Sequence, residues 1–146
     1  MKKYILIVDD DALVRKTVRT FCGILRGVEH LEAATAEEAI RLFDQNNVVM
    51  VISDLNMPGE SGLHLLRHVR LRDRRVPFVI NSGSLTAGED DKLRDAGADL
   101  VLTKGADFRE FIRMIRSLLK EDAGVAAGGA VPAAGSSLPF PSSPAP

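Results

Sequence analysis

The sequence predicts an α/β fold in which a five-stranded parallel sheet is doubly wound, with helices on both faces. Five strand candidates, four of them short apolar runs rich in Val, Ile and Leu, alternate along the chain with five segments of helical character. The run Val48–Ile52 contains no polar residue, so we expect it to form a strand that is buried on both faces. Right-handed crossovers between such strands place helices on both faces of the sheet.

The first strand–helix pair is predicted at Tyr4–Val8 and Ala12–Arg26. The strand contains β-branched residues and stops at three consecutive acids, Asp9 to Asp11. Apolar side chains then recur at helical spacing, and Gly27 is suited to end the helix. The residues expected on the apolar face of this helix are Leu13, Val14, Thr17, Val18, Phe21 and Leu25.

The second and third pairs are predicted from capping and turn signals. Val28–Ala34 is a weaker strand pattern, and Thr35 with Glu38 forms a capping-box signal that opens the second helix. An unbroken apolar run leads to the carboxylate that ends the segment 48–54, and Pro-Gly follows shortly after it. This turn signal is typical of the point where a buried strand reaches solvent. A helix from about Ser61 to Asp73 comes next.

The fourth and fifth strand–helix pairs are predicted from sequence signals of different strength. Pro77–Asn81 and Asp99–Thr103 are the predicted fourth and fifth strands. The helix between them, at about Thr86–Ala96, has few apolar anchors, so we expect an exposed or mobile element. Asp107 is suited to cap the final helix, whose apolar stripe is the most regular in the chain. That stripe consists of Phe108, Phe111, Ile112, Ile115, Leu118 and Leu119.

Composition limits the number of domains and the classes of partner. A chain of 146 residues, 45% hydrophobic and 27% charged, has room for one globular domain and a tail. We expect the domain to occupy residues 1–122. Residues 123–146, mostly Ala, Gly, Pro and Ser, are expected to form a disordered tail or a linker. The net charge of −1 gives no reason to expect direct binding to nucleic acid.

The cysteine content and the N-terminal segment indicate the compartment. Cys22 is the single cysteine, so neither an intramolecular disulfide nor a cysteine-based zinc site can form. The first apolar run ends in acids and does not read as a signal peptide, and no run is long enough to span a bilayer. We therefore predict a cytoplasmic location with no membrane insertion.

Polar residues close four of the predicted strands, and they are the candidate functional residues: Asp9, Asp10, Asp54, Ser82 and Lys104. Because the carboxyl ends of parallel strands share one edge of the sheet, we expect these side chains to meet there. Three carboxylates in one place repel each other, and a hard cation such as Mg²⁺ together with an ammonium relieves that repulsion. An Asp carboxylate in such a site can attack phosphorus and form an aspartyl phosphate.

Four segments in this order resemble the receiver domain of bacterial response regulators, over about Tyr4–Lys120. They are Ile7-Val8-Asp9-Asp10-Asp11, then Asp54-Leu55-Asn56-Met57-Pro58-Gly59 with Gly62, then Ser82-Gly83, and finally Lys104. The resemblance implies a flavodoxin-like fold of strand order 2-1-3-4-5. It also implies a two-component signalling role, in which a histidine kinase or phosphotransfer protein phosphorylates Asp54.

The resemblance also assigns individual roles. Asp10 and Asp54 are expected to bind Mg²⁺ directly, Asp9 to bind it through water, and the backbone carbonyl of Asn56 to complete the protein ligands. The expected partners of the phosphoryl oxygens are Ser82 and Lys104. The absence of a recognisable output domain predicts a stand-alone, chemotaxis-regulator-like switch, not an enzyme, that changes its affinity for a protein partner not identified by the sequence.

Two positions depart from the family pattern. Gly105 stands where the family has a proline after its lysine, usually in a cis bond. A non-proline cis bond costs about 3 kcal/mol, so we expect a trans bond or a rearranged loop here. Val101 stands where the family commonly has an aromatic residue that relays phosphorylation to the surface of the fourth helix, fifth strand and fifth helix. The sequence therefore does not indicate how phosphorylation would be relayed to that surface.

Two alternatives remain. A phosphohydrolase of the haloacid-dehalogenase type is suggested by Asp9-x-Asp11 after a strand, but that family has Thr or Val where this chain has Leu13, and Asp54 would have no role. A degenerate receiver that docks without phosphorylation is suggested by Val101 and Gly105. The retained acids and lysine favour the phosphorylated switch, because a scaffold has no physical need for buried like charges.

Overall fold

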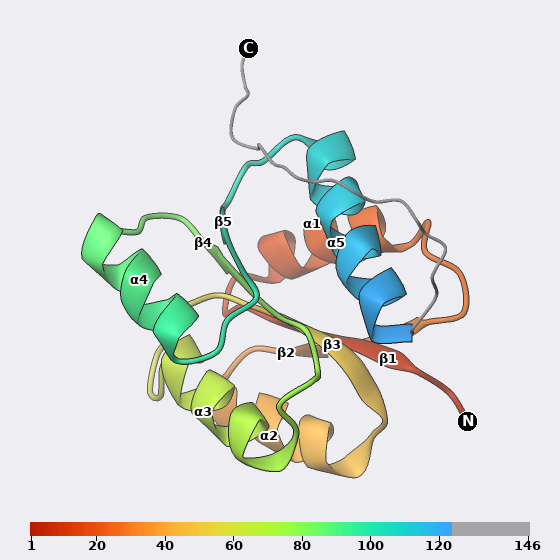
Figure 1. Cartoon of the computed structure of the whole chain (residues 1–146), viewed down its shortest axis with the longest axis horizontal. Coiled ribbons are helices and arrows are strands. Elements are labelled where there is room, and N and C mark those ends of the chain that lie inside the picture. Colours follow the sequence, from red (N-terminus) through yellow and green to blue (C-terminus); the bar gives the residue numbers. More distant parts are fainter. Residues whose placement is uncertain (124–146) are drawn as a thin grey trace.

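The computed structural model describes residues 1–123 and the side chains of residues 1–119, and the predicted tail or linker, residues 124–146, lies outside that range. It contains a five-stranded parallel sheet of order β2-β1-β3-β4-β5, as predicted (Figure 1). The strands are β1 (Tyr4–Val8), β2 (Glu29–Ala33), β3 (Val48–Ser53), β4 (Phe78–Ser82) and β5 (Leu100–Thr103). The helices are α1 (Ala12–Cys22), α2 (Ala36–Gln45), α3 (Gly62–Arg72), α4 (Ala87–Asp95) and α5 (Phe108–Ala123).

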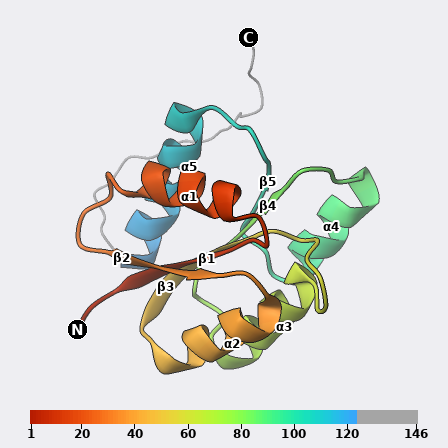
Figure 2. The same cartoon turned by 180° about the vertical axis from the view of Figure 1, so that it is seen from behind.

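Helices cover both faces of the sheet. α1 and α5 lie over one face, and α2, α3 and α4 lie over the other (Figures 1 and 2). Alternate residues of the interior strand β1 therefore enter different cores: Ile5 and Ile7 pack with α1 and α5, whereas Leu6 and Val8 pack with α2 and α3. All four are buried, which confirms that β1 is covered on both sides.

The register of the sheet brings the strand ends together. Val8 of β1 lies opposite Ser53 of β3, so the next residue of each strand emerges at the same level. Ser82, the last residue of β4, lies opposite Thr103 of β5. The residues that follow β1, β3 and β5 therefore share one edge, and this edge carries the site.

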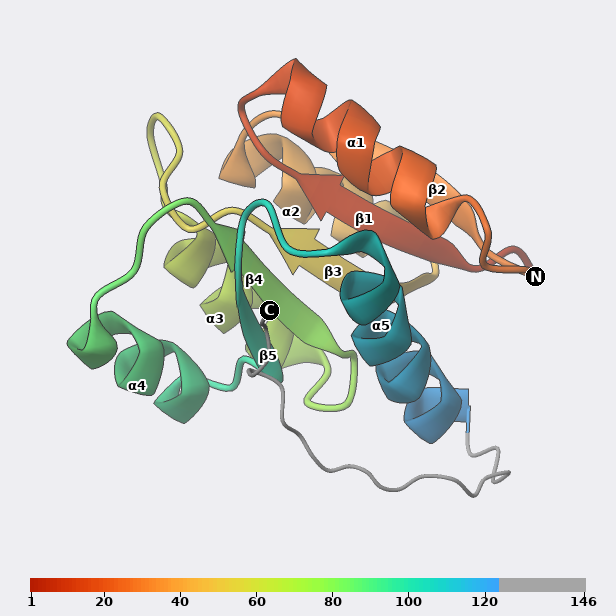
Figure 3. The ribbon, with the colours of Figure 1, turned by 90° about the horizontal axis from the view of Figure 1, so that it is seen from above.

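The first helix differs from its prediction. α1 ends at Cys22, and the Gly23 amide closes the last turn on the carbonyl of Thr20 (3.2 Å). Its buried residues are Val18 and Cys22, whereas Leu13 is 70% exposed and does not belong to the core face as predicted. Leu13 lies in the first turn of α1, which runs along β1 (Figure 3). Helical spacing alone does not fix how the helix is rotated against the sheet.

Capping residues explain where the helices begin. Thr35 caps α2 as predicted, although the Glu38 carboxylate accepts from the amide of Ala34 and not from Thr35. A complete capping box joins Thr86 and Glu89 at the start of α4, where none was predicted. Leu93 is the buried residue of α4, so this helix is weakly anchored, in line with the few apolar residues in its sequence.

Candidate functional site

The backbone fixes the two residues that follow β1 and β3. The amide of Asp54 donates to the carbonyl of Val8 (2.8 Å), and the amide of Asp9 donates to the carbonyl of Ala33 (3.1 Å). Both bonds continue the parallel ladders one residue beyond the strands. The two carboxylates are thus held by the sheet and not by a loose loop, which favours a precisely oriented site.

One ammonium group bridges two buried carboxylates. The Nζ atom of Lys104 lies 2.9 Å from Oδ2 of Asp9 and 3.0 Å from Oδ2 of Asp54. Asp9 is 3% exposed and Asp54 is 6% exposed. Carboxylate oxygens of Asp9, Asp54 and the exposed Asp10 lie within 4.8 Å of one another. Two buried carboxylates therefore contact one ammonium, and the exposed carboxylate of Asp10 lies beside them at this edge of the sheet.

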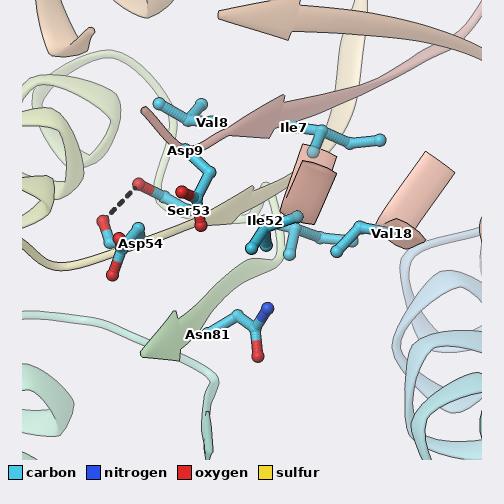
Figure 4. Close-up of a pocket in the computed structure, with 9 residues that line it drawn as sticks. Ile7, Val8, Asp9, Val18, Ile52, Ser53, Asp54 and Asn81 are labelled. Carbon is cyan, nitrogen blue, oxygen red and sulfur yellow. Dashed lines mark hydrogen bonds between the residues drawn. The ribbon is translucent and has the colours of Figure 1, made fainter. Parts of the chain in front are cut away.

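The second oxygen of Asp54 faces the backbone. Oδ1 accepts from the amide of Leu55 (2.7 Å) and, more weakly, from the amide of Asn56 (3.4 Å). Its two oxygens are thus held separately, one by amides and one by Lys104. Figure 4 shows Asp9 and Asp54 at the adjacent ends of β1 and β3, with the hydroxyl of Ser53 bonded to the Asp54 carbonyl (2.8 Å).

Burial and charge set the protonation of the cluster. Burial raises the pKa of Asp9, and the nearby Asp54 charge raises it further, whereas hydrogen bonds from Lys104 and the Asp11 amide oppose this shift. Burial alone would lower the pKa of Lys104, but its bonds to Asp9 and Asp54 outweigh burial and raise it. Lys104 therefore stays charged, while Asp9 lacks full compensation for its buried charge.

The comparison with protein families matches residues 5–116 to the response regulator receiver domain. This chain belongs to that family. The receiver domain is 31% identical over 115 residues to the response regulator UvrY of Escherichia coli, an alignment that covers 78% of this chain and 53% of UvrY. The chain thus spans about half the length of the curated relatives it matches.

Solved structures of receiver domains have the same fold. A CheY-like receiver domain protein of Methanospirillum hungatei superposes with a TM-score of 0.77 at 26% identity, covering 85% of this chain and 98% of that one. A LuxR-family two-component response regulator of Aurantimonas gives a TM-score of 0.74 at 31% identity, covering 83% and 87%. The predicted flavodoxin-like receiver fold is confirmed.

The residues at the sheet edge fit a magnesium ion. Mg²⁺ prefers hard oxygen ligands and keeps several waters, and an exposed carboxylate beside two buried ones provides both oxygens and access to water. Burial, and to a smaller extent the Asp54 charge, raise the pKa of Asp9, and a bound cation would favour its ionised form. Receiver domains in general use Mg²⁺ at such an acidic site. The carboxylate oxygens of Asp9, Asp10 and Asp54 are therefore suited to bind Mg²⁺.

Ser82 and Asn56 lie beside the cluster but are less engaged than Lys104. Ser82 is buried, and its hydroxyl makes one long contact, 3.4 Å, with the carbonyl of Ser84. The backbone amide of Lys104 donates to the Ser82 carbonyl (2.9 Å), which keeps the two residues adjacent. Asn56 is exposed at the start of the loop after β3. Their roles remain predictions.

Two glycines shape the loops around the site. A Cβ atom at Gly62 would collide with the carbonyl oxygen of Asp54, so the start of α3 packs against the backbone of Asp54 only if residue 62 is glycine. Gly105 has φ +89°, a left-handed conformation, and no peptide bond in residues 1–123 is cis. The expectation of a trans Lys104–Gly105 bond is confirmed. Val101 is half-buried and packs against the core on the α2–α3 face.

The structure adds two residues that the sequence did not single out. Asn81 is 8% exposed and lines the same small pocket as Asp9 and Asp54 (Figure 4). An amide inside an otherwise apolar strand is the sequence signal for it. Arg15 donates to the carbonyl of Asp9 (2.7 Å), a contact that no short sequence pattern indicates. No helix of the described residues is long and apolar enough to cross a membrane.

Proposed function

We propose that this receiver domain is a phosphoacceptor switch in a two-component phosphorelay, and that Asp54 accepts the phosphoryl group. The observation that carries the proposal is the shared ammonium: Lys104 contacts Asp54 and Asp9 at about equal distance. An ammonium so placed holds the acceptor oxygen at a fixed point. It is also within reach of the oxygens of a phosphoryl group bonded to that carboxylate.

The transfer is a displacement at phosphorus. A carboxylate oxygen of Asp54 forms the new P–O bond, and the bond from phosphorus to the phosphodonor breaks, with the electron pair leaving on the donor. The donor is a histidine kinase or a phosphotransfer protein, by the family assignment. Mg²⁺, when bound, supplies a positive charge that stabilises the phosphoryl oxygens in the transition state. Its proposed ligands are Asp9, Asp10, Asp54 and the backbone carbonyl of Asn56.

Phosphorylation then changes the contacts of the neighbouring side chains. A phosphoryl group adds strong acceptor oxygens and negative charge, which attracts Lys104 away from Asp9. The Ser82 hydroxyl gives up only a long contact with Ser84 to bind the same oxygens. Movement of the segment after β4 reaches α4, whose buried anchor is Leu93. We therefore propose that the phosphorylated domain changes its affinity for a downstream protein partner.

The proposed function is signalling and not enzymatic turnover. In the phosphohydrolase alternative, Asp11 would act on the substrate beside Asp9. Asp11 instead caps α1, where its carboxylate accepts from the amide of Leu13 (2.9 Å). This placement favours the switch. The docking-only receiver is the second candidate, supported by Val101 and Gly105, which differ from the usual relay residues.

The test is incubation with acetyl phosphate and Mg²⁺, followed by mass spectrometry of the intact protein. We expect the wild type to gain one phosphoryl group and Asp54→Asn to gain none. Asp11→Asn is the matched control, because Asn also caps helices and this residue lies outside the cluster. An unlabelled wild type would overturn the proposal, and the docking-only receiver would then be favoured.

A further inference from the structure

Two arginines one turn apart on α1 share a single carboxylate on the edge strand β2. Nε of Arg15 lies 3.0 Å from Oε1 of Glu32, and Nη1 of Arg19 lies 3.0 Å from Oε2. Arg15 alone makes a further bond, from Nη1 to the carbonyl oxygen of Asp9 (2.7 Å). Across the side chains of residues 1–119, no hydrogen bond joins Arg19 to the turn after β1. Arg15 therefore differs from Arg19 by one contact, the hydrogen bond to Asp9 at the candidate site.

The Arg15–Glu32 pair is sheltered. The side chains of Arg15 and Glu32 are 18% and 29% exposed, whereas that of Arg19 is 59% exposed. Burial alone would raise the pKa of Glu32, but the hydrogen bonds from Arg15 and Arg19 outweigh it and lower the pKa. Glu32 is therefore ionised near neutral pH, and its charge holds the guanidinium of Arg15 in place.

The bond to Asp9 fixes a peptide unit. The carbonyl of Asp9 and the amide of Asp10 belong to one rigid peptide plane. The orientation of this carbonyl therefore fixes the direction of the chain at Asp10. The Asp9 amide is already bound by the carbonyl of Ala33, the neighbour of Glu32. The edge strand β2 therefore holds Asp9 on both sides, directly through Ala33 and indirectly through Arg15.

We propose that Arg15 is a positioning residue for the cation site. Anchored by Glu32, it orients the Asp9–Asp10 peptide so that both carboxylates face Asp54. This inference rests on the proposed function, because it assigns a role in binding the cation proposed there. The hydrogen bonds of Arg15 go to the carbonyl oxygen of Asp9 and to Glu32, so we argue its effect on the cation from geometry. Residues that orient metal ligands commonly change metal affinity by about 10–100-fold when removed.

The test compares Arg15→Gln with Arg19→Gln, the matched control that loses one bond to the same carboxylate. Mg²⁺ affinity is measured by isothermal titration calorimetry. We expect Arg15→Gln to bind Mg²⁺ at least about tenfold more weakly than wild type, and Arg19→Gln to bind within about twofold. Arg15→Lys is expected to fall between them, because an ammonium lacks the planar fork that reaches two acceptors. Equal weakening by both Gln variants would overturn the proposal.

A second readout needs no metal. The amide of Asp11 donates to Oδ1 of Asp9 (2.9 Å), so its hydrogen exchange reports the order of the turn. We expect faster exchange in Arg15→Gln and unchanged exchange in Arg19→Gln, and unchanged exchange in both would overturn the proposal. If Arg15→Gln does not fold, Arg15→Lys replaces it, with Mg²⁺ affinity and Asp11 exchange expected to change in the same direction by a smaller amount. Wild type that binds no Mg²⁺ contradicts the proposed function, whereas wild-type binding that Arg15→Gln retains contradicts only this inference.

Discussion

The Nζ atom of Lys104 lies 3.0 Å from Oδ2 of Asp54, although the two residues are 50 positions apart in the chain. The contact depends on the parallel register of β3, β4 and β5, which brings the residues after β3 and β5 to one edge. It also places the same ammonium against Asp9, so a change at any one of these three side chains alters the charge balance of the other two.

Lys104→Met is predicted to separate metal binding from phosphorylation. Removal of the ammonium leaves Asp9 and Asp54 uncompensated, so Mg²⁺ should bind more tightly, and calorimetric titration measures this. Phosphorylation by acetyl phosphate should slow by about 100-fold, because a fixed positive charge at the phosphoryl oxygens is lost. Without metal the variant should be less stable by about 1–3 kcal/mol, a value reduced for the partial exposure of Lys104. Weaker Mg²⁺ binding would contradict the predicted charge balance.

Asp9→Asn is predicted to stabilise the metal-free domain at neutral pH. The pKa of Asp9 is raised above its ordinary value of 3.8 in the folded state, so protonation favours folding, and this contribution is lost as pH rises through the raised pKa. A neutral amide removes that loss, and we expect a melting temperature about 2–5 °C higher at pH 7. The gain should shrink towards pH 3 and in saturating Mg²⁺. Thermal unfolding followed by circular dichroism measures it, and a lower melting temperature at pH 7 without metal would count against the prediction.

Gly62→Ala is predicted to disrupt the loop that follows β3. Its Cβ would collide with the Asp54 carbonyl oxygen and touch the backbone of Leu55, neither of which is the end of a flexible side chain. We expect a loss of stability of about 2–4 kcal/mol in urea unfolding. Gly88→Ala in α4 is the control: nothing lies within 4 Å of its added Cβ, and it should be stabilising by about 0.5–1 kcal/mol. Equal effects of the two variants would contradict the packing at Gly62.

Gly105→Pro is predicted to be destabilising, although proline is the usual residue of the family here. Gly105 has φ +89°, whereas proline requires φ near −65°. We expect a loss of about 1–3 kcal/mol in urea unfolding. Gly105→Ala has open space around its Cβ and should lose only about 1 kcal/mol, from the left-handed backbone. A Gly105→Pro variant as stable as wild type would show that this loop adopts the family conformation at little cost.

The sequence predicts most of the fold and the proximity of the charged cluster, for physical reasons. Apolar runs that end in polar residues define both the strands and their exposed ends, and parallel topology then brings Asp9, Asp54 and Lys104 together. Residue identity also predicts the trans bond before Gly105, because a cis bond without proline is costly. These features follow from local sequence and one rule of topology.

The features that the sequence does not predict depend on how the helices pack against the sheet. Leu13 matches helical spacing but is exposed, because the rotation of α1 is set by contacts of Val18 and Cys22. The bond from Arg15 to Asp9 relies on Glu32, which lies 17 residues away on a strand that the crossover brings alongside. The periodicity of apolar residues does not predict such side-chain contacts, because they depend on packing between different helices and strands.

The position of the phosphoryl group tests the central claim most directly. Protein phosphorylated with acetyl phosphate is reduced with borohydride, which converts an aspartyl phosphate to homoserine, and is then digested and sequenced by tandem mass spectrometry. Homoserine at position 54, with Asp9 and Asp10 unmodified, is the predicted result. Homoserine at another position, or none in protein that has bound Mg²⁺, would contradict the account.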